Sequence, residues 1–338
     1  MASRPISPRY DPAPELSLVV PCFNEESVLA ETHRRLISTL EQLSLPFELI
    51  YVDDGSRDHT PAKLAEIQQS DPRVRVVALS RNFGHQLAIT AGLNHSRGRA
   101  VVVIDADLQD PPEVILDMLA RWREGYEVVY GTRLRRDGET VFKTKTAEWF
   151  YRAINRISEI PIPLDTGDFR LLDRKAVDAL TAMPERDRFV RGMVSWVGFR
   201  QIAVPYDRAA RHAGESKYSL FKMLRFATDG ILSFSIVPLR IATFLGIAAV
   251  AAALIAAAAT VVLTLASPFR PSPWLAVLLA GLFIGGVQLI CLGIAGEYLG
   301  RIYGESKHRP LYVVRETRGF DDPIPDRSTN LAANVTRS

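Results

Sequence analysis

The segment Asp105–Asp110, which reads Asp-Ala-Asp-Leu-Gln-Asp, directly follows the apolar run Ala100–Ile104. Two carboxylates two positions apart at a strand end present hard oxygen ligands, and Mg²⁺ or Mn²⁺ binds such groups together with substrate phosphates. A solvated acidic turn that caps the next helix is the simpler alternative. The position after a buried strand, beside two other polar loops, favours a metal site.

A second acidic pair, Asp53 and Asp54, ends the apolar run Phe47–Val52. A carboxylate at such a strand end can accept a hydrogen bond from a base N–H or a ribose hydroxyl. A plain turn is the competing explanation, because Gly55 and Ser56 follow.

The glycine-rich fingerprints of dinucleotide dehydrogenases and P-loop enzymes do not occur in the sequence. The charge of a bound diphosphate must then be met by a metal ion and by basic side chains. The candidates are Arg133, Arg211 and Lys217.

Strands and helices alternate along the first part of the chain, and the strands are continuous apolar runs, which is typical of an α/β domain with a mostly parallel sheet. The expected strands are Leu16–Val20, Phe47–Val52, Val74–Leu79, Ala100–Ile104 and Glu127–Tyr130, the last closing the series. The expected helices are Glu25–Leu43, one that begins at Thr60 and Pro61, Gly84–Asn94, and one that begins at Pro111 and Pro112.

Ligands of parallel sheets bind outside the carboxyl ends of the strands. The polar segments Cys22–Glu25, Asp53–Ser56 and Asp105–Gln109 all follow strands. We therefore expect three loops to converge on one rim of the sheet.

Only one charged residue, Arg270, lies between Arg240 and Glu297. The stretches Ile241–Phe269 and Pro271–Gly296 are each longer than the roughly 20 apolar residues that cross a bilayer. Two membrane spans are therefore expected, with a buried helix hairpin of a soluble domain as the alternative.

The start of the chain, Met1–Pro14, is polar and proline-rich and does not read as a signal peptide. Basic residues flank both expected spans, which by the positive-inside rule places both termini and the α/β domain in the cytoplasm, in a multi-pass protein of the inner (plasma) membrane. These residues are Lys217, Lys222, Arg225 and Arg240 before the first span, and Arg301, Lys307 and Arg309 after the second.

Two basic amphipathic segments, Val141–Ser158 and Ser219–Phe234, are expected to be helices. They could lie in the membrane interface or pack on the sheet, and the interface is favoured for the second, which leads into a span. A short strand is expected at Leu311–Arg315, followed by a polar tail without a core. The expected domains are a flexible tail (1–14), the α/β domain (15–215), interface helices (216–238), a two-helix transmembrane hairpin (239–300) and a cytoplasmic tail (301–338).

Glycine pairs four residues apart in the second apolar stretch permit close helix approach and suit a homo-oligomer. The pairs are Gly281 with Gly285 and Gly296 with Gly300. A net charge of +3 does not indicate nucleic-acid binding.

Several of these motifs together resemble the inverting family 2 glycosyltransferases of the GT-A fold. They are Val19–Glu26 (Val-Val-Pro-Cys-Phe-Asn-Glu-Glu), Val52–Ser56 and Asp105–Gln109. Further segments are similar to polyprenyl-phosphate glycosyltransferases, namely dolichol-phosphate mannose synthases and, more closely, bactoprenol glucosyltransferases. These segments are Leu79–Gln86, Thr166–Leu171 and Arg211–Tyr218. The resemblance covers about residues 15–315.

The resemblance implies a role for each matching residue. The nucleoside would be held by Pro21, Phe23, Glu25 and Asp53. Ribose and diphosphate would contact Asp105 and Ala106, and the metal ion, Mg²⁺ or Mn²⁺, would bind Asp107 and Gln109. Donor diphosphate or lipid phosphate would be engaged by Arg133, Arg211 and Lys217. Asp168 is the position that the family offers as catalytic base, and Asp107, Arg211 and Lys217 would share in catalysis with it.

The chemistry of a lipid-phosphate acceptor leaves the role of Asp168 open. A phosphate monoester has a second pKa near 6 and is largely ionised at neutral pH, so a strong base is less necessary than for a hydroxyl acceptor. Orienting the acceptor or stabilising a cationic sugar carbon are the alternatives for this carboxylate. Direct attack would invert an α-linked donor to a β-linked product.

The resemblance favours glucose from UDP-glucose as donor, with GDP-mannose, UDP-N-acetylhexosamine and UDP-formamidoarabinose as alternatives. A processive polysaccharide synthase is disfavoured, since Arg191–Trp196 reads Arg-Gly-Met-Val-Ser-Trp in place of the Q-x-x-R-W motif. A catalytically silent membrane scaffold is disfavoured by the intact acidic and basic site residues.

Overall fold

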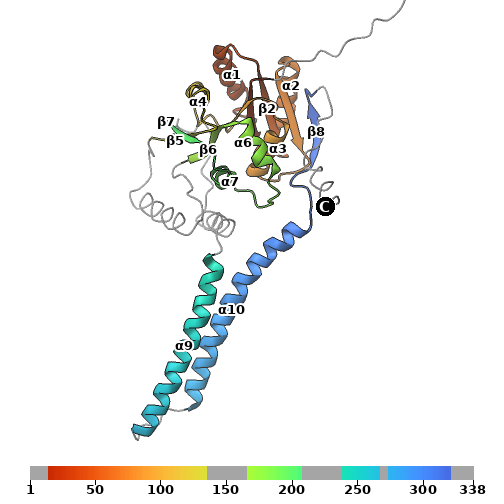
Figure 1. Cartoon of the computed structure of the whole chain (residues 1–338). Helices are drawn as coiled ribbons and strands as arrows, with labels where there is room; N and C mark the ends of the chain where they lie inside the picture. Colours follow the sequence, from red (N-terminus) through yellow and green to blue (C-terminus); the bar gives the residue numbers. More distant parts are fainter. Residues whose placement is uncertain (1–13, 135–165, 208–236, 267–272, 321–338) are drawn as a thin grey trace, which may run out of the picture. The chain divides into compact units, whose positions relative to one another are not determined.

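The computed structural model describes residues 14–134, 166–207, 237–266 and 273–320, which form two compact units (Figure 1). One unit contains the β-sheet with its covering helices, and the other contains two long apolar helices. The expected tail before residue 14, both basic amphipathic segments and the connection between the apolar stretches lie outside the described residues.

Eight strands form one mixed sheet in the order β7-β5-β6-β4-β1-β2-β3-β8. Their bounds are β1 Leu16–Cys22, β2 Phe47–Asp53, β3 Val74–Leu79, β4 Ala100–Val103, β5 Val128–Arg133, β6 Thr166–Asp173, β7 Gln201–Tyr206 and β8 Val314–Arg318. The central pairs β1–β2, β1–β4 and β2–β3 are parallel, as is β5–β7, whereas β6 and β8 run antiparallel to their neighbours. The expected α/β class with a mostly parallel sheet is confirmed.

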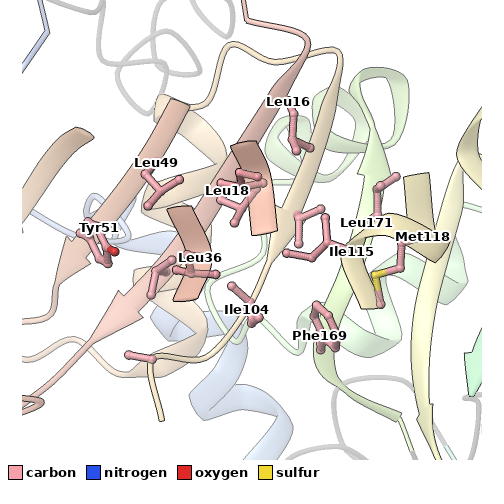
Figure 2. Packing of buried hydrophobic residues seen from close by; sticks show 14 of the residues in the cluster. Leu16, Leu18, Leu36, Leu49, Tyr51, Ile104, Ile115, Met118, Phe169 and Leu171 are labelled. Carbon is pink, nitrogen blue, oxygen red and sulfur yellow. The ribbon is translucent and has the colours of Figure 1, made fainter. Parts of the chain in front are cut away.

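Helices cover the sheet and complete its core. They are α1 Leu29–Leu40 with a 3₁₀ turn at Glu41–Leu43, α2 Thr60–Ser70, α3 His85–His95, α4 Val114–Arg123, α6 Arg174–Ala182 and α7 Val190–Trp196. Every residue of β1 is buried, including Ser17, as expected for a central strand that is covered on both faces. Figure 2 shows Leu36 of α1 and Ile115 of α4 packing against strand residues such as Leu18.

The first helix begins at Leu29 rather than at the expected Glu25. Asn24 adopts a left-handed conformation with φ 58°, which interrupts the backbone before the helix. The N–H group of Glu25 donates to Thr60 Oγ1, at the start of α2, and the N–H group of Glu26 donates to Asp58 Oδ2, in the loop before it. These residues therefore join two loops and do not start α1.

The expectation that Glu127–Tyr130 closes the series of strands is wrong. β6 inserts between β4 and β5, and β7 adds beyond β5. The strand period of β6 is obscured by the charged residues Asp168 and Arg170, both of which are buried. β8 starts at Val314, three residues after the expected Leu311.

The second unit contains α9, Val237–Ala266, and α10, Pro273–Ser306. Apolar windows of 21 and 24 residues, Ala242–Val262 and Phe283–Ser306, have mean hydropathies of 2.5 and 1.4. By length and composition, both helices are able to cross a membrane. The two helices meet where the Cys291 thiol donates to the Ala242 carbonyl at 3.2 Å. α10 ends at Ser306, six residues beyond the expected boundary at 300.

Candidate active site

Two polar loops that follow neighbouring parallel strands are joined by hydrogen bonds. Asn24 N donates to Ser56 Oγ at 3.0 Å, and Asn24 Oδ1 accepts from Arg57 N at 2.9 Å. Asp54 N donates to the Cys22 carbonyl at 2.9 Å. Because β1 and β2 run parallel, their carboxyl ends and the loops that follow lie at the same edge of the sheet.

The acidic pair after β2 divides into two different environments. Both Asp54 oxygens accept hydrogen bonds from the loop before α3: from Asn82 Nδ2 at 2.9 Å, and from the backbone N–H groups of Phe83 and Gly84 at 2.7 and 2.9 Å. Burial raises the pKa of Asp54, although these backbone hydrogen bonds oppose the shift. Asp54 is therefore a structural anchor for the loop before α3.

Asp53 is 1% exposed, and its two carboxylate oxygens differ in their hydrogen bonding. Its Oδ1 accepts from Ser56 N at 3.0 Å. Its Oδ2 is buried and accepts no hydrogen bond from any described residue. A buried carboxylate oxygen in this state is costly unless a ligand supplies a donor.

The turn after Asp53 and Asp54 requires glycine. Gly55 has φ +70°, and an added Cβ would lie 2.4 Å from the Arg81 carbonyl carbon. The loops after β2 and β3 thus pack backbone to backbone, which explains the residue type at this position.

The acidic segment after β4 forms a tight turn that contains Asp107 and Gln109. Asp107 Oδ1 accepts from Gln109 N at 3.1 Å, around Leu108 in a left-handed conformation with φ 57°. Gln109 is 7% exposed, and within the described structure its Oε1 has no hydrogen-bond donor. Ala106 is buried, and its carbonyl accepts from Thr32 Oγ1 of α1 at 2.7 Å.

This segment fits a cation that is shared with a ligand. Asp107 and Gln109 offer hard oxygen atoms of the kind that Mg²⁺ and Mn²⁺ prefer. Among the described residues, no group of three or more His, Cys, Asp or Glu side chains is arranged to hold a metal ion. Mg²⁺ commonly binds through one or two carboxylates and completes its shell with substrate phosphates and water. The arrangement therefore fits such a shared site better than a closed protein site.

Asp168 on β6 is held from three sides. Arg191 of α7 donates through Nε to Oδ1 at 2.9 Å, and Gln86 Nε2 donates to Oδ2 at 3.1 Å. His85 Nε2 lies 3.3 Å from Oδ2 and 3.4 Å from Asp105 Oδ1, so one imidazole links β6 to the acidic loop after β4. Gln86 also accepts from Val190 N at 3.0 Å, which ties α3 to the start of α7.

These contacts decide the charges at the centre of the site. Burial alone would raise the pKa of Asp168, but the hydrogen bond from His85 and the charge of Arg191 outweigh it and hold this pKa far below its usual range. Burial lowers the pKa of His85, and hydrogen bonding to Asp168 with the charge of Asp105 reverses this, leaving the pKa raised. Burial raises the pKa of Asp105 to about 6, against the opposing charge of His85. Asp168 is thus a fixed anion.

Arg133, at the end of β5, belongs to a second polar group. Its side chain hydrogen-bonds to Tyr206, whose hydroxyl donates to Asp110 Oδ1. Burial and the charge of Asp110 raise the pKa of Tyr206. This group links Arg133 to the acidic segment after β4 through Tyr206.

The structure therefore gathers most of the expected site residues around one edge. The Cys22 thiol is fully buried, and its pKa is raised by burial and by the nearby charges of Glu25, Asp53 and Asp105. Phe23 is 42% exposed beside them, and Pro21 lies in the buried end of β1. Arg211 and Lys217 lie outside the described residues.

Three residues at the centre had no expected role. His85 and Gln86 are expected only as part of the motif Leu79–Gln86 and of the helix Gly84–Asn94, and Arg191 follows a loop with no periodic pattern. The signal that could have found His85 and Gln86 is their position at the start of α3, after β3. Arg191 carries no comparable signal, because its contact with Asp168 spans 23 residues and depends on the unexpected strand β6.

Comparison with known proteins gives a consistent result. Residues 17–181 match the sequence pattern of the protein family "Glycosyl transferase family 2". The chain is 48% identical over 308 residues to "Uncharacterized glycosyltransferase YkcC" of Bacillus subtilis, covering 91% of this chain and 95% of the relative. It is 42% identical over 306 residues to "Bactoprenol glucosyl transferase" of Shigella phage SfV, covering 90% of this chain and 99% of that protein.

Solved structures are more distant. A crystal structure of glucosyl-3-phosphoglycerate synthase from Mycobacterium tuberculosis, in complex with Mn²⁺, UDP-glucose and phosphoglyceric acid, is 22% identical with a TM-score of 0.45. The match covers 65% of this chain and 79% of that chain.

Proposed function

Because this chain belongs to glycosyl transferase family 2, we propose that it transfers one sugar from a nucleotide-sugar to a membrane-bound polyprenyl phosphate. The bactoprenol glucosyl transferase of phage SfV, aligned over almost its full length, supports a bactoprenol-type acceptor and glucose as the sugar. UDP-glucose is accordingly the proposed donor.

The observation that carries this proposal is the group of acidic loops at one edge of the sheet. Pro21, Phe23, Glu25 and Asp53 are proposed to hold the nucleoside, and Asp105 with Ala106 to contact ribose and diphosphate. Asp107 and Gln109 are proposed to hold Mg²⁺ or Mn²⁺, whose positive charge would offset that of the leaving diphosphate. Arg133, with Arg211 and Lys217 outside the described residues, is proposed to bind phosphate groups.

In the proposed reaction, an oxygen of the lipid phosphate attacks the anomeric carbon as the bond from that carbon to the donor diphosphate breaks. The products are a polyprenyl-phosphate sugar of inverted configuration and a nucleoside diphosphate. The acceptor oxygen is largely ionised at neutral pH and needs no strong base.

Asp168 suits an electrostatic role in this scheme. Its contacts with Arg191, Gln86 and His85 keep it anionic, so it is a weak proton acceptor. A fixed negative charge favours the positive charge that develops on the sugar carbon. We therefore propose that Asp168 stabilises or orients the reacting groups and does not accept a proton.

The two long apolar helices support membrane attachment. Many of their large apolar side chains are exposed within their own unit, including Leu254 at 67% and Ile255 at 70%. Exposed apolar surface of this extent is typical of contact with lipid or another protein. We propose a multi-pass inner-membrane protein whose catalytic domain and termini are cytoplasmic. The glycine pairs of α10 favour a homo-oligomer.

The test is to incubate membranes containing the full chain with polyprenyl phosphate and a series of labelled donors, with and without a chelator. UDP-glucose is expected to label the lipid, and the chelator to stop the transfer. Labelling only from GDP-mannose, UDP-N-acetylhexosamine or UDP-formamidoarabinose would change the donor but not the reaction. Labelling from no donor would support a silent scaffold and overturn the proposal.

A further inference from the structure

The chain returns to the sheet immediately after its second apolar helix. α10 ends at Ser306, and β8 begins at Val314 and pairs antiparallel with β3 at the sheet edge (Figure 1). The segment 310–320 belongs to the same compact unit as the sheet. Its strand is therefore part of the unit that carries the acidic loops.

Several contacts fix this returning segment. Ser80 N donates to the Val313 carbonyl at 2.9 Å, and Asn94 Nδ2 donates to the Tyr312 hydroxyl at 2.7 Å. The guanidinium of Arg75 donates to the Gly319 carbonyl at 2.5 Å. The segment is thus anchored before, within and after β8, which fixes the backbone position of each strand residue.

The pairing of β8 with β3 is irregular at one residue. Ala78 lies opposite Glu316 and Leu79 lies opposite Val314, so Arg315 is left without a paired residue on β3. Such a bulge bends the strand and redirects a side chain. The Arg315 guanidinium lies 3.8 Å from Asp53 Oδ2, at the end of β2, which pairs with β3 on the side opposite to β8.

This oxygen is the buried acceptor of Asp53 that has no hydrogen bond among the described residues. At 3.8 Å, the positive charge of Arg315 balances the negative charge of Asp53, but the distance is too long for a hydrogen bond to Oδ2. The Arg315 side chain is 49% exposed, so its other N–H groups remain available to a ligand. Asp53 Oδ2 and the Arg315 guanidinium therefore offer a ligand an acceptor and a donor next to each other.

We propose that Arg315 belongs to the nucleoside subsite and determines which base is bound. This inference rests on the proposed use of a nucleotide-sugar with Asp53 at the base. Asp53 Oδ2 accepts the ring N–H of the base, and Arg315 donates to the adjacent ring carbonyl oxygen. Uracil and guanine both carry a ring N–H beside a carbonyl, whereas cytosine and adenine carry an unprotonated ring nitrogen beside an amino group. The pair selects the first two bases and rejects the others.

The test measures nucleotide binding, independently of sugar transfer. The full chain in detergent micelles with Mn²⁺ is titrated by calorimetry with UDP, GDP, CDP and ADP. The variants are R315Q, which removes the charge, and R315K, which keeps the charge but not the planar set of donors. R318Q is the matched control, because Arg318 lies on the same strand and pairs with Glu316.

For the wild type, UDP or GDP is expected to bind more tightly than CDP and ADP. R315Q is expected to bind that favoured nucleotide about 10-fold to 100-fold more weakly than the wild type, as for a lost hydrogen bond to a charged group. R315K should recover part of this loss, R318Q should match the wild type, and CDP should bind all proteins equally weakly. The melting temperature of R315Q should equal that of R318Q.

Two results overturn the inference alone: equal binding of the favoured nucleotide to R315Q and wild type, or equal weakening of all four nucleotides by R315Q. A loss in R315Q that is matched by unfolding, with R315K binding like the wild type, would assign Arg315 to stability and also overturn it. A wild-type protein that binds no nucleotide would instead overturn the proposed function, and this inference with it.

Discussion

Arg191 and Asp168 form an ion pair in which Arg191 Nε donates to Asp168 Oδ1 at 2.9 Å. The aspartate side chain is 6% exposed and the arginine side chain 26% exposed, so solvent screens the pair only partly. The pair joins α7 to β6, the strand inserted between β4 and β5. It keeps a negative charge at a constant position beside the acidic loop that follows β4.

Removing Arg191 should destabilise the fold in a pH-dependent way. R191Q leaves Asp168 buried with a poorly paired charge, and we expect a loss of about 2 kcal/mol in the free energy of unfolding at neutral pH. The folded-state pKa of Asp168 is depressed, so the pair stabilises the protein above the unfolded-state pKa of about 3.9, and this contribution disappears as the pH falls below that value. Denaturation in detergent from about pH 3 to about pH 8 measures the effect.

The difference between wild type and R191Q should therefore be constant above about pH 5 and shrink below about pH 4. K175Q is the control, because Lys175 is exposed on the neighbouring helix α6. A difference that grows on acidification contradicts the depressed pKa of Asp168.

The pH dependence of transfer should follow the acceptor and not Asp168. Since Asp168 stays ionised, the acidic limb of kcat/KM should reflect the second ionisation of the lipid phosphate, near a pKa of about 6. Replacing the acceptor with a polyprenyl phosphonate, which has a higher second pKa, should move this limb upward by the same amount. An acidic limb that stays in place with both acceptors would contradict this prediction and assign the limb to an ionising enzyme group, such as Asp105 with its pKa of about 6.

Metal binding should depend on Asp107. D107N should lower transfer by about 100-fold or more, since the loss of one charged ligand weakens the cation beside the leaving diphosphate. Calorimetry should show that Mn²⁺ strengthens UDP binding to the wild type and that this gain is largely lost in D107N. D117N, at an exposed position of α4, is the matched control and should behave like the wild type. Transfer that persists in chelator would contradict a cation in the reaction.

The contact between the loops after β2 and β3 should make Gly55 intolerant of alanine. Gly55 and Gly198 have similar φ angles of +70° and +72°, but an added Cβ meets the Arg81 backbone at 2.4 Å in the first case and no atom closer than 3.8 Å in the second. G198A should cost about 1–2 kcal/mol for the left-handed conformation alone. G55A should cost clearly more, as measured by the free energy of unfolding. Equal losses would mean that the loop moves away without cost.

Structural features that depend on neighbouring residues could be predicted from the sequence, whereas those that depend on distant residues could not. The apolar runs of β1 to β4 and the acidic residues that end them were visible, because parallel strands place their carboxyl ends together. β6 was missed since Asp168 and Arg170 break its apolar pattern, although both are buried. Arg170 donates to the Gly167 carbonyl at 2.8 Å, and burial lowers its pKa to about 10. A buried polar residue whose hydrogen bonds are formed within the protein cannot be distinguished from a loop residue by its sequence pattern.

The family expected from the motifs is confirmed by relatives that align along most of the chain. The pairings of Asp168 with Arg191 and of Asp53 with Arg315 could not be foreseen. Each depends on an inserted or added strand, β6 or β8, whose partner is set by tertiary structure and not by neighbouring residues. Arg315 moreover lies 262 positions after Asp53 in the sequence.

The position of β8 in the chain also sets an order of assembly during translation. The ribosome must synthesise both long apolar helices before it reaches Val314. β3 therefore lacks its partner β8 while these helices are being made, and the described sheet is completed only when β8 emerges. A nascent chain halted within α10 would carry the acidic loops but lack both β8 and Arg315.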